Sequence, residues 1–383
     1  MKDKKATYNL SKELFINGAL IGMCALTLTS CGGGGGGGGS SNSNSSSSSQ
    51  VNIICPTSNQ PNSAYICQGT DYINEPIITV YIDGKPVSLL LDTGASGILV
   101  NQSAVNIPSS DYTNTPFFGT FGDGSTYSGT VASATVCLNP NYKNTCVVMP
   151  VNVDYLEIAF SPSGEAQGDF GVDCGSNIFS QNSFCYFYYL EAQNGVNSYA
   201  LSFSALSNTF YASPSPNSPI GELTFGAYNN SNNGLISYNG GGFPSTTAIF
   251  SSYTSSIPSF TAGNSFFDTG SNFNYITTDV FKTEIPNFSR TNNEGACYQN
   301  VLNGGLNISY NIQNVYSTTF LTEPPQNMCN LLTQPLVIEG ATVDAGSYSS
   351  VGYEDFGFPE MIRHSFVWIL DNKGFVEYIK ISN

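Results

Sequence analysis

Two segments of the chain repeat one pattern, and this repetition constrains the fold more than any other feature of the sequence. Residues 89–96 read Leu-Leu-Leu-Asp-Thr-Gly-Ala-Ser and residues 265–272 read Ser-Phe-Phe-Asp-Thr-Gly-Ser-Asn, which places Asp92 and Asp268 176 residues apart. A given tripeptide arises by chance in about one chain in ten at average residue usage, and two copies in matching apolar contexts are far rarer. The alternative is a pair of unrelated turns between strands. We therefore expect two similar halves, each bringing one Asp to a turn after an apolar run.

The composition favours a mainly β protein. The chain has 383 residues, more than one hydrophobic core usually serves, so we expect a body of two lobes or two domains. Only 10% of residues are charged, and the 39 Gly, 23 Tyr and 25 Phe suit short strands and frequent turns better than long solvated helices. The formal net charge of -16 would repel phosphate backbones, so nucleic acid is not an expected partner.

The N-terminal residues predict export and a lipid anchor. Four Lys within the first twelve residues precede an apolar run at 14–28, which is too short for a permanent membrane span. The run leads into residues 28–31, Leu-Thr-Ser-Cys, which resemble the lipobox of bacterial lipoproteins, in which the Cys, here Cys31, is acylated. The alternative is an ordinary signal peptide with a chance Cys. We predict a lipoprotein signal peptide at 1–31 and a flexible tether at 32–50, made of eight Gly and a Ser/Asn tract, with a reach of roughly 25 Å.

These features predict where the protein is located and that its lipid anchor binds a membrane. The protein is expected in the bacterial cell envelope, held to the membrane by its lipid, on the periplasmic or the outer surface. Gly32 follows the Cys, which resembles lipoproteins sorted to the outer membrane if the host is Gram-negative.

The cysteines predict disulfides. Beyond Cys24 and Cys31 eight Cys remain, an even number in an exported protein, which favours disulfides over metal ligands. Spacing does not prove connectivity, but the residues fall into sequence-near pairs: Cys55 with Cys67, Cys137 with Cys146, Cys174 with Cys185, and Cys297 with Cys329.

Other chemistries have little support. His364 is the only His, whereas nucleophilic hydrolases need a His base and zinc sites generally need several His or reduced Cys. No phosphate-cradling pattern of Gly, Lys and Ser/Thr is present. We expect no cofactor and no metal, and infer that any catalysis is the work of carboxylates.

Two Asp residues that share one proton can hydrolyse a peptide bond. One carboxylate takes a proton from water while the other group protonates the substrate carbonyl. Two carboxyls a few ångströms apart cannot both ionise, so one pKa of the pair falls and the other rises, as in the aspartic proteases that serve as the standard example. Each Gly allows the tight turn after the Asp, and each Thr hydroxyl can bond backbone of the opposite half.

The chain resembles the pepsin family of aspartic peptidases over most of residues 71–383. Beyond the two motifs, the first landmarks are a hairpin at 77–91 with an Asp-Gly turn of type I′, and a flap at Phe121, Gly122, Asp123 and Gly124 that continues to 131. An apolar-Gly element at 168–172 would brace the first motif, and a closing element at 356–374 would brace the second. Between them, a strand pair at 221–226 and 234–236 would cross between the lobes. More narrowly, the layout resembles bacterial lipoproteins with pepsin-like motifs.

The resemblance implies a fold, a site and a reaction. The fold is the mainly β, bilobal acid protease fold, with β-barrel-like lobes at 51–228 and 229–383 and a cleft between them. The catalytic pair is Asp92 and Asp268, supported by Thr93, Gly94, Thr269, Gly270 and Ser271, and the Cys297–Cys329 pair matches a family disulfide.

Several positions depart from the family pattern. Ala95 replaces a Ser whose hydroxyl bonds the ionised Asp, which predicts a catalytic pair less acidic than that of a stomach-type enzyme. Phe121 replaces the flap Tyr, for which Tyr127 or Tyr112 is a candidate substitute, although a packed strand position is the simpler interpretation of each. The Asp-Ala-Gly at 344–346 imitates the motif without a buried apolar run before it, and is expected to be an exposed turn.

We therefore expect a monomeric aspartic endopeptidase that cuts extended peptides, with apolar flanking residues implied by the resemblance. One alternative is a pepsin-shaped surface or binding protein whose activity has decayed, which Ala95 and Phe121 permit. The other is an apolar-ligand or adhesin role, which rests on the Tyr- and Asn-rich composition alone.

Overall fold

A computed structural model describes most of the first half of the chain and separate parts of the second. The described residues are 29–30, 53–68, 76–121, 126–156, 165–173, 185–194, 196–203, 217–226, 234–238, 246–252, 260–261, 264–270, 274–277, 306–321, 336–339, 353–362, 364–370 and 376–382.

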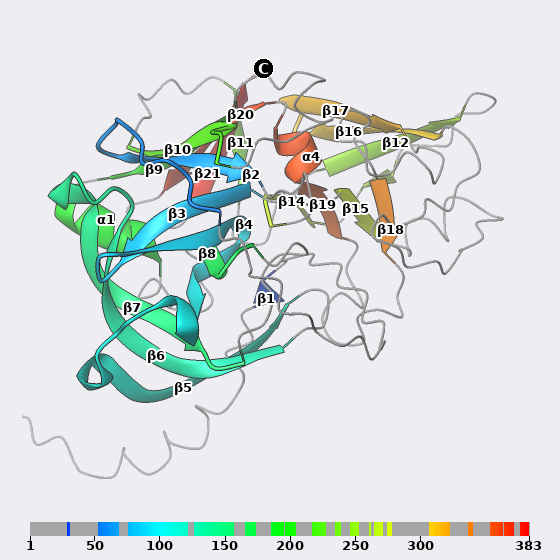
Figure 1. The fold of residues 1–383 in the computed structure, drawn as a ribbon. Helices are drawn as coiled ribbons and strands as arrows, with labels where there is room; N and C mark the ends of the chain where they lie inside the picture. The colour runs from blue at the N-terminus through cyan, green and yellow to red at the C-terminus, as the bar shows by residue number, and fades with distance from the viewer. Residues whose placement is uncertain are drawn as a thin grey trace, which may run out of the picture.

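These residues form a mainly β protein, which confirms the expected class (Figure 1). The strands of the first half are β1 (Thr29–Ser30), β2 (Ser63–Gln68), β3 (Pro76–Ile82), β4 (Lys85–Asn101), β5 (Tyr112–Phe121), β6 (Thr126–Cys137), β7 (Cys146–Asp154), β8 (Gly168–Asp173), β9 (Ser198–Phe203) and β10 (Gly221–Phe225). Those that follow are β11 (Leu235–Ser237), β12 (Thr246–Ser252), β13 (Phe260–Thr261), β14 (Asn264–Asp268), β15 (Asn274–Thr277), β16 (Leu306–Ile312), β17 (Tyr316–Leu321), β18 (Leu336–Glu339), β19 (Tyr353–Gly357), β20 (Ser365–Leu370) and β21 (Val376–Ser382). The helices are α1 (Tyr186–Asn194) and α4 (Phe358–Met361), with short 3-10 turns η2 (Gln102–Ala104), η3 (Ser109–Asp111) and η4 (Lys143–Thr145).

Three sheets organise these strands. The largest has 13 strands in the order β1-β5-β6-β7-β4-β3-β2-β10-β9-β20-β21-β11, with β8 paired to β4. Because β3 pairs with β6 as well as with β4, the strands β3, β4, β7 and β6 close on one another as a small barrel. Two further sheets of four strands each, β13-β12-β16-β17 and β14-β19-β15-β18, lie together on the other side of the molecule (Figure 1).

The large sheet joins strands from distant parts of the chain. The C-terminal strand β20 pairs with β9, and β21 pairs with β11, so strands from both sides of residue 228 share one sheet. The predicted pairing of 221–226 with 234–236 is wrong, since β9, β20 and β21 separate β10 from β11. The cause is that the C-terminal hairpin supplies the hydrogen-bonding partners of both β9 and β11.

The predicted hairpin at 77–91 is confirmed. Strands β3 and β4 are antiparallel, and the Asp83-Gly84 turn between them has φ of 48° and 80°, the two positive values that a type I′ turn requires. The turn is also tied to the neighbouring strand, because the Asp83 carboxylate accepts a 2.8 Å hydrogen bond from the backbone N–H of Thr135. Strand β4 then continues through the first Asp-Thr-Gly, further than the apolar run predicted.

The segment expected to form the flap is also a hairpin. Strands β5 and β6 pair antiparallel from Tyr112 to Thr120. Phe121 ends β5 in the backbone, but its side chain and the tip at 122–125 lie outside the described residues.

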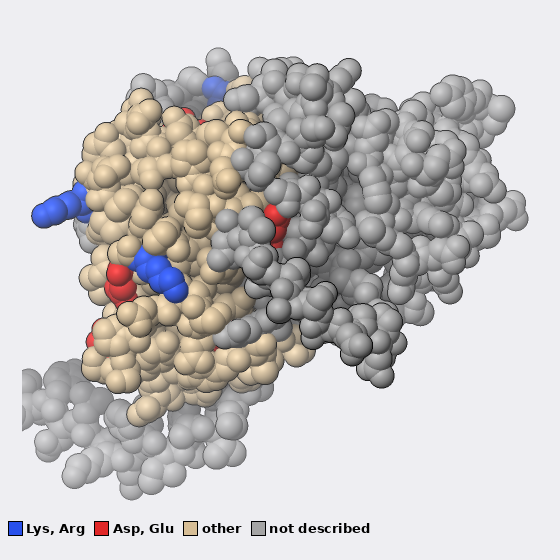
Figure 2. Space-filling model, in the orientation of Figure 1, with Lys and Arg blue, Asp and Glu red and all other residues tan. Residues whose placement is uncertain are grey.

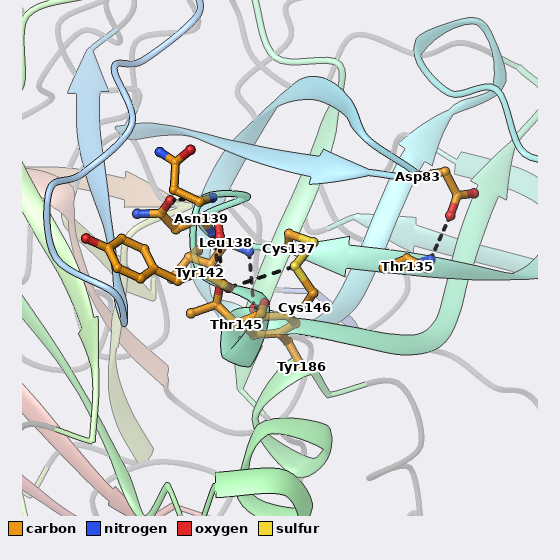
Figure 3. Close-up of a disulfide and its surroundings, with 10 residues drawn as sticks. Asp83, Thr135, Cys137, Leu138, Asn139, Tyr142, Thr145, Cys146 and Tyr186 are labelled. Atoms are coloured by element: carbon orange, nitrogen blue, oxygen red, sulfur yellow. Dashed lines mark hydrogen bonds between the residues drawn. A yellow bond between two sulfur atoms is a disulfide. The ribbon is translucent and has the colours of Figure 1, made fainter.

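Two of the predicted disulfides are present. Cys55 bonds to Cys67, and Cys137 bonds to Cys146. The second joins β6 to β7 (Figure 3). Beside it lie buried hydrogen bonds, in which the Tyr186 hydroxyl donates to the Thr145 carbonyl and accepts from the Leu138 N–H. Cys185 is disulfide-bonded as well.

Several predicted features lie outside the described residues. They are most of the signal peptide, Cys31 and the tether, Ser271, the Asp-Ala-Gly at 344–346, and Cys174, Cys297 and Cys329.

Few charges interrupt the surface of the described part, as Figure 2 shows for one face. None of the helices that the structure describes is long and apolar enough to cross a bilayer.

Candidate active site

The first Asp-Thr-Gly is framed by one long strand and one short one. Strand β8 pairs with β4 on both sides of the motif, and Asp92 itself pairs with Gly171. Before the motif, residue numbers increase in the same direction on both strands, from the pair Leu90↔Asp169 to the pair Asp92↔Gly171. After the motif, in the second arm of β4, they change in opposite directions, from Gly97↔Gly171 to Val100↔Gly168. A Cβ at Gly171 would lie 2.6 Å from the Ala95 carbonyl carbon, so only Gly lets β8 pass this close. The predicted bracing element at 168–172 is therefore present.

The second Asp-Thr-Gly has a frame with the same register. Strand β19 pairs in parallel with β14, from Asn264↔Tyr353 to Asp268↔Gly357. It also pairs antiparallel with β15, which follows the motif. The partner of each Asp is the Gly of an Asp-Phe-Gly sequence, at 169–171 and 355–357. The match extends to the second arms, where Leu99 and Tyr275, each seven residues after its Asp, pair with Asp169 and Asp355.

The two motifs are joined by four reciprocal hydrogen bonds. The Thr93 hydroxyl accepts from the Thr269 N–H at 3.0 Å and donates to the Phe267 carbonyl at 2.8 Å. The Thr269 hydroxyl accepts from the Thr93 N–H at 3.0 Å and donates to the Leu91 carbonyl at 2.5 Å. Both Thr side chains are buried, so these bonds are shielded from water. Segments more than 170 residues apart in sequence are thus fixed in one relative position.

Each Gly of the motifs lies against the carboxyl of the opposite half. A Cβ on Gly94 would come within 2.5 Å of Oδ2 of Asp268, and a Cβ on Gly270 within 2.6 Å of Oδ2 of Asp92. Each Gly N–H also donates to Oδ1 of its own Asp, at 2.7 Å from Gly94 and 2.8 Å from Gly270. The structure therefore brings the two predicted Asp residues together in a symmetric arrangement, with both side chains fully buried.

Burial dominates the electrostatics of the first carboxyl. It raises the pKa of Asp92 above its usual range, against the opposing effect of hydrogen bonds with Asp268, the Gly94 N–H, Asp169 and the Ala95 N–H. The direction agrees with the prediction made from Ala95, but the main cause is desolvation rather than the missing hydroxyl.

A third carboxyl, which the sequence had not singled out, accompanies the pair. Asp169 on β8 is 4% exposed and lies within hydrogen-bonding reach of the Asp92 side chain. Its pKa lies well above the ordinary value, because of burial first and of the charge on Asp92 second. The repeated Asp-Phe-Gly at 169–171 and 355–357 was the signal available in the sequence.

Tyr127, one of the two candidate substitutes for the flap Tyr, lies beside this group. It is 3% exposed, its ring stacks on Phe117 with 5.3 Å between centroids, and the charges of Asp169, Asp154 and Asp92 add to the burial that raises its pKa. Tyr112 is only half-buried, and its pKa is raised by burial and by Tyr155 rather than by these carboxyls.

No metal site emerges in the part of the chain that the structure describes, where no three His, Cys, Asp or Glu side chains gather in a way that could hold an ion. His364 precedes β20, and its Nε2 lies 3.6 Å from the buried Glu360 carboxylate, to which the Tyr316 hydroxyl donates. The single His is therefore a packed residue near α4.

No family model matches this chain, and comparison with curated proteins finds no match either.

Proposed function

We propose that this protein is an aspartic endopeptidase of bilobal, pepsin-like design, in which Asp92 and Asp268 are the catalytic pair. The observation that carries the proposal is the reciprocal bonding of Thr93 and Thr269, which holds two buried Asp residues against each other. Turns that merely link strands have no reason to meet in this way across more than 170 residues.

The arrangement suits hydrolysis by a water activated between the carboxyls. Because two close carboxyls retain one proton between them, the ionised group takes a proton from water while the other protonates the carbonyl oxygen of the substrate. The water oxygen then bonds to the carbonyl carbon. Collapse of this tetrahedral species breaks the C–N bond, and the amine leaves with a proton from the pair. The raised pKa of Asp92 supports an optimum above about pH 3.

The strand arrangement supports an extended peptide as substrate. Strand β1, two residues of extended chain, pairs in parallel with β5 at Thr120 and Phe121 and also contacts β4. Strand β4 is one of the two strands that frame Asp92, and Figure 1 shows β1 below it. A substrate strand placed in the same way would exchange backbone hydrogen bonds with the edge of β5. If the predicted cleavage before Cys31 occurs, β1 is removed and this edge becomes available.

Two four-stranded sheets, one of which contains Asp268, and a barrel that contains Asp92 support the bilobal part of the proposal. Each motif then belongs to a separate body, and the Thr bonds span the junction.

The test is cleavage of an unfolded protein by the purified mature protein across pH 3 to 7. Asp92→Asn and Asp268→Asn should each lower the rate at least about 1000-fold, because neither half of the acid–base pair works alone. Asp83→Asn is the matched control. It makes the same change in an exposed turn whose positive φ Asn tolerates, and it should leave the rate unchanged.

A folded protein that cuts nothing at any pH, and whose melting temperature a statine-type transition-state mimic does not raise, would reject this proposal. The decayed, pepsin-shaped binding protein would then be the better interpretation.

A further inference from the structure

We infer that Asp169 is a positioning residue of the site, a protonated carboxyl that donates a hydrogen bond to Asp92 and takes the place of the hydroxyl that Ala95 lacks. This inference rests on the proposed function, because it concerns the group that orients and tunes one member of the catalytic pair.

The register of β8 places Asp169 on the same face as Asp92. Its pairing partners are Leu90 and Leu99, and Leu90 shares a face with Asp92 because side chains two apart along a strand point the same way. The next residue, Phe170, belongs to the opposite face and is fully buried in the main core. Asp169 is thus a polar side chain of β8 on the face that carries Asp92, next to the buried Phe170.

The surroundings of Asp169 are otherwise apolar. Leu90 and Leu99 belong to a small cluster of buried side chains separate from the main core, completed by Phe117, Tyr127, Val131 and Ala166. A carboxylate buried here would be costly, since the charged form loses its hydration. Among the described residues no Lys, Arg or His acts on Asp92 or Asp169 to offset that loss.

The unpaired oxygens point to a shared proton. Oδ2 of Asp92 and Oδ1 of Asp169 are both buried, and no N–H or hydroxyl of the described residues donates to either. The two side chains nevertheless lie within hydrogen-bonding reach of each other, and two carboxyls can bond only when one carries a proton. Burial and the charge of Asp92 raise the pKa of Asp169, so Asp169 is the donor and Asp92 the acceptor.

The other titratable groups around this bond are acidic. Asp268 bonds to Asp92 from the opposite motif, and Tyr127 feels the charges of Asp92, Asp169 and Asp154. Of these groups, Asp92 acts directly on Asp169 and opposes a negative charge there. As pH rises Asp169 must still ionise, and Asp92 then loses its donor and faces a like charge. Ionisation of Asp169 therefore lowers activity on the alkaline side, in addition to the loss of the proton that Asp92 and Asp268 share.

The experiment compares four forms of the mature protein in pH-rate profiles with separate kcat and KM values. Asp169→Leu removes the donor and should lower kcat about 10- to 100-fold with little change in KM, the loss expected for a hydrogen bond to a charged group. Adding Ala95→Ser to Asp169→Leu supplies a hydroxyl next to Asp92 and should restore most of the loss. Asp169→Asn keeps a donor that cannot ionise, so its activity should fall less steeply on the alkaline side than that of the wild type.

A second measurement does not depend on catalysis. With its pKa raised in the folded state, Asp169 binds more protons folded than unfolded at pH values above the ordinary 3.8, so it favours folding most below that value and loses this contribution as pH rises through the folded pKa. The melting temperature of the wild type should therefore drop relative to Asp169→Asn between pH 4 and 8.

The outcomes separate this inference from the proposed function. If the wild type cleaves but Asp169→Leu keeps its profile, or Ala95→Ser rescues nothing, the positioning role is wrong. Selective loss of cleavage next to Lys or Arg would also overturn it, since Asp169 would then be reading a cation of the substrate. If no form cleaves, the proposed function fails while the melting curves still decide whether Asp169 holds its proton.

Discussion

The two Asp-Thr-Gly motifs sit in backbone frames of one register but in different surroundings. The first lies within β4, an unbroken strand of 17 residues that belongs to the barrel and the large sheet. The second begins at the last residue of β14 and ends before β15, and these are short strands of a separate four-stranded sheet. The bracing strand pairs with both arms in each case, and each Asp faces the Gly of Asp-Phe-Gly. The same backbone pairing thus sets the position of each Asp, although the two motifs belong to different sheets.

The side chains around the two frames differ. Beside Asp92 stands Ala95, and the described groups that act on its carboxyl are Asp268, two backbone N–H groups and Asp169. The second motif keeps Ser271 at the equivalent position. The comparison indicates that backbone geometry aligns the carboxyls, whereas neighbouring side chains decide how each holds a proton.

Among the comparisons of the two motifs, the largest loss of activity is expected from replacing the glycine of either motif, which tests whether the two glycines are equivalent. Gly94→Ala and Gly270→Ala each place a Cβ within 2.6 Å of the opposite carboxyl, which must move. Displacement by about 1 Å is enough for a loss of roughly 100-fold. We expect at least that loss of kcat/KM in peptide cleavage for both variants.

Gly84→Ala serves as the control for the glycine variants. It meets nothing within 4 Å but is strained by a φ of +80°, so it should lower the melting temperature and leave kcat/KM intact. Unequal losses at Gly94 and Gly270 would break the proposed symmetry.

Variants of the two motif threonines test whether the motifs support each other equally, through the free energy of unfolding. Thr93→Val and Thr269→Val each remove the hydrogen bonds that the hydroxyl makes to a backbone N–H and a backbone carbonyl of the opposite motif. The expected cost is about 2–4 kcal/mol in the free energy of unfolding for either variant, measured by urea denaturation. Thr113→Val, which removes a partly buried bond to the Val131 carbonyl, should cost about 1 kcal/mol. A difference between the two motif variants larger than their experimental error would argue against reciprocal support.

The smallest expected effect on catalysis comes from a bridge that stabilises the barrel without positioning the carboxyls. Removing the Cys137–Cys146 bridge, which spans a separation of 9 residues, by Cys137→Ala with Cys146→Ala should cost about 2.5 kcal/mol through the unfolded chain. Thermal unfolding would measure this loss. The bridge joins β6 to β7 and touches neither motif, so kcat at 25 °C should stay at the wild-type value; a matching loss of kcat would mean that the barrel and the carboxyls are coupled.

Local features were predictable from the sequence. The Asp83-Gly84 turn between alternating apolar residues specified its hairpin, and near Cys pairs specified two disulfides. The Asp-Thr-Gly repeat predicted that Asp92 and Asp268 would meet, because the chemistry of one carboxyl requires the other.

Pairings between distant strands were not predictable in the same way. Nothing local in β10 or β11 indicates that β9 and the C-terminal hairpin lie between them, since a strand's partner depends on the whole fold. Asp169 was overlooked because its signal in the sequence, the repeated Asp-Phe-Gly, does not indicate burial. Its place on the face that carries Asp92 emerged from the register of β8.

The crossed threonine bonds have a consequence for how the protein can be divided. Each motif obtains the partners of its buried hydroxyl from the other motif, so a fragment carrying only one of them contains half of every bond at the junction. Neither half expressed alone should form a competent site. Two separately made halves, once mixed, should complement each other, and the regained activity would report directly on the strength of that junction.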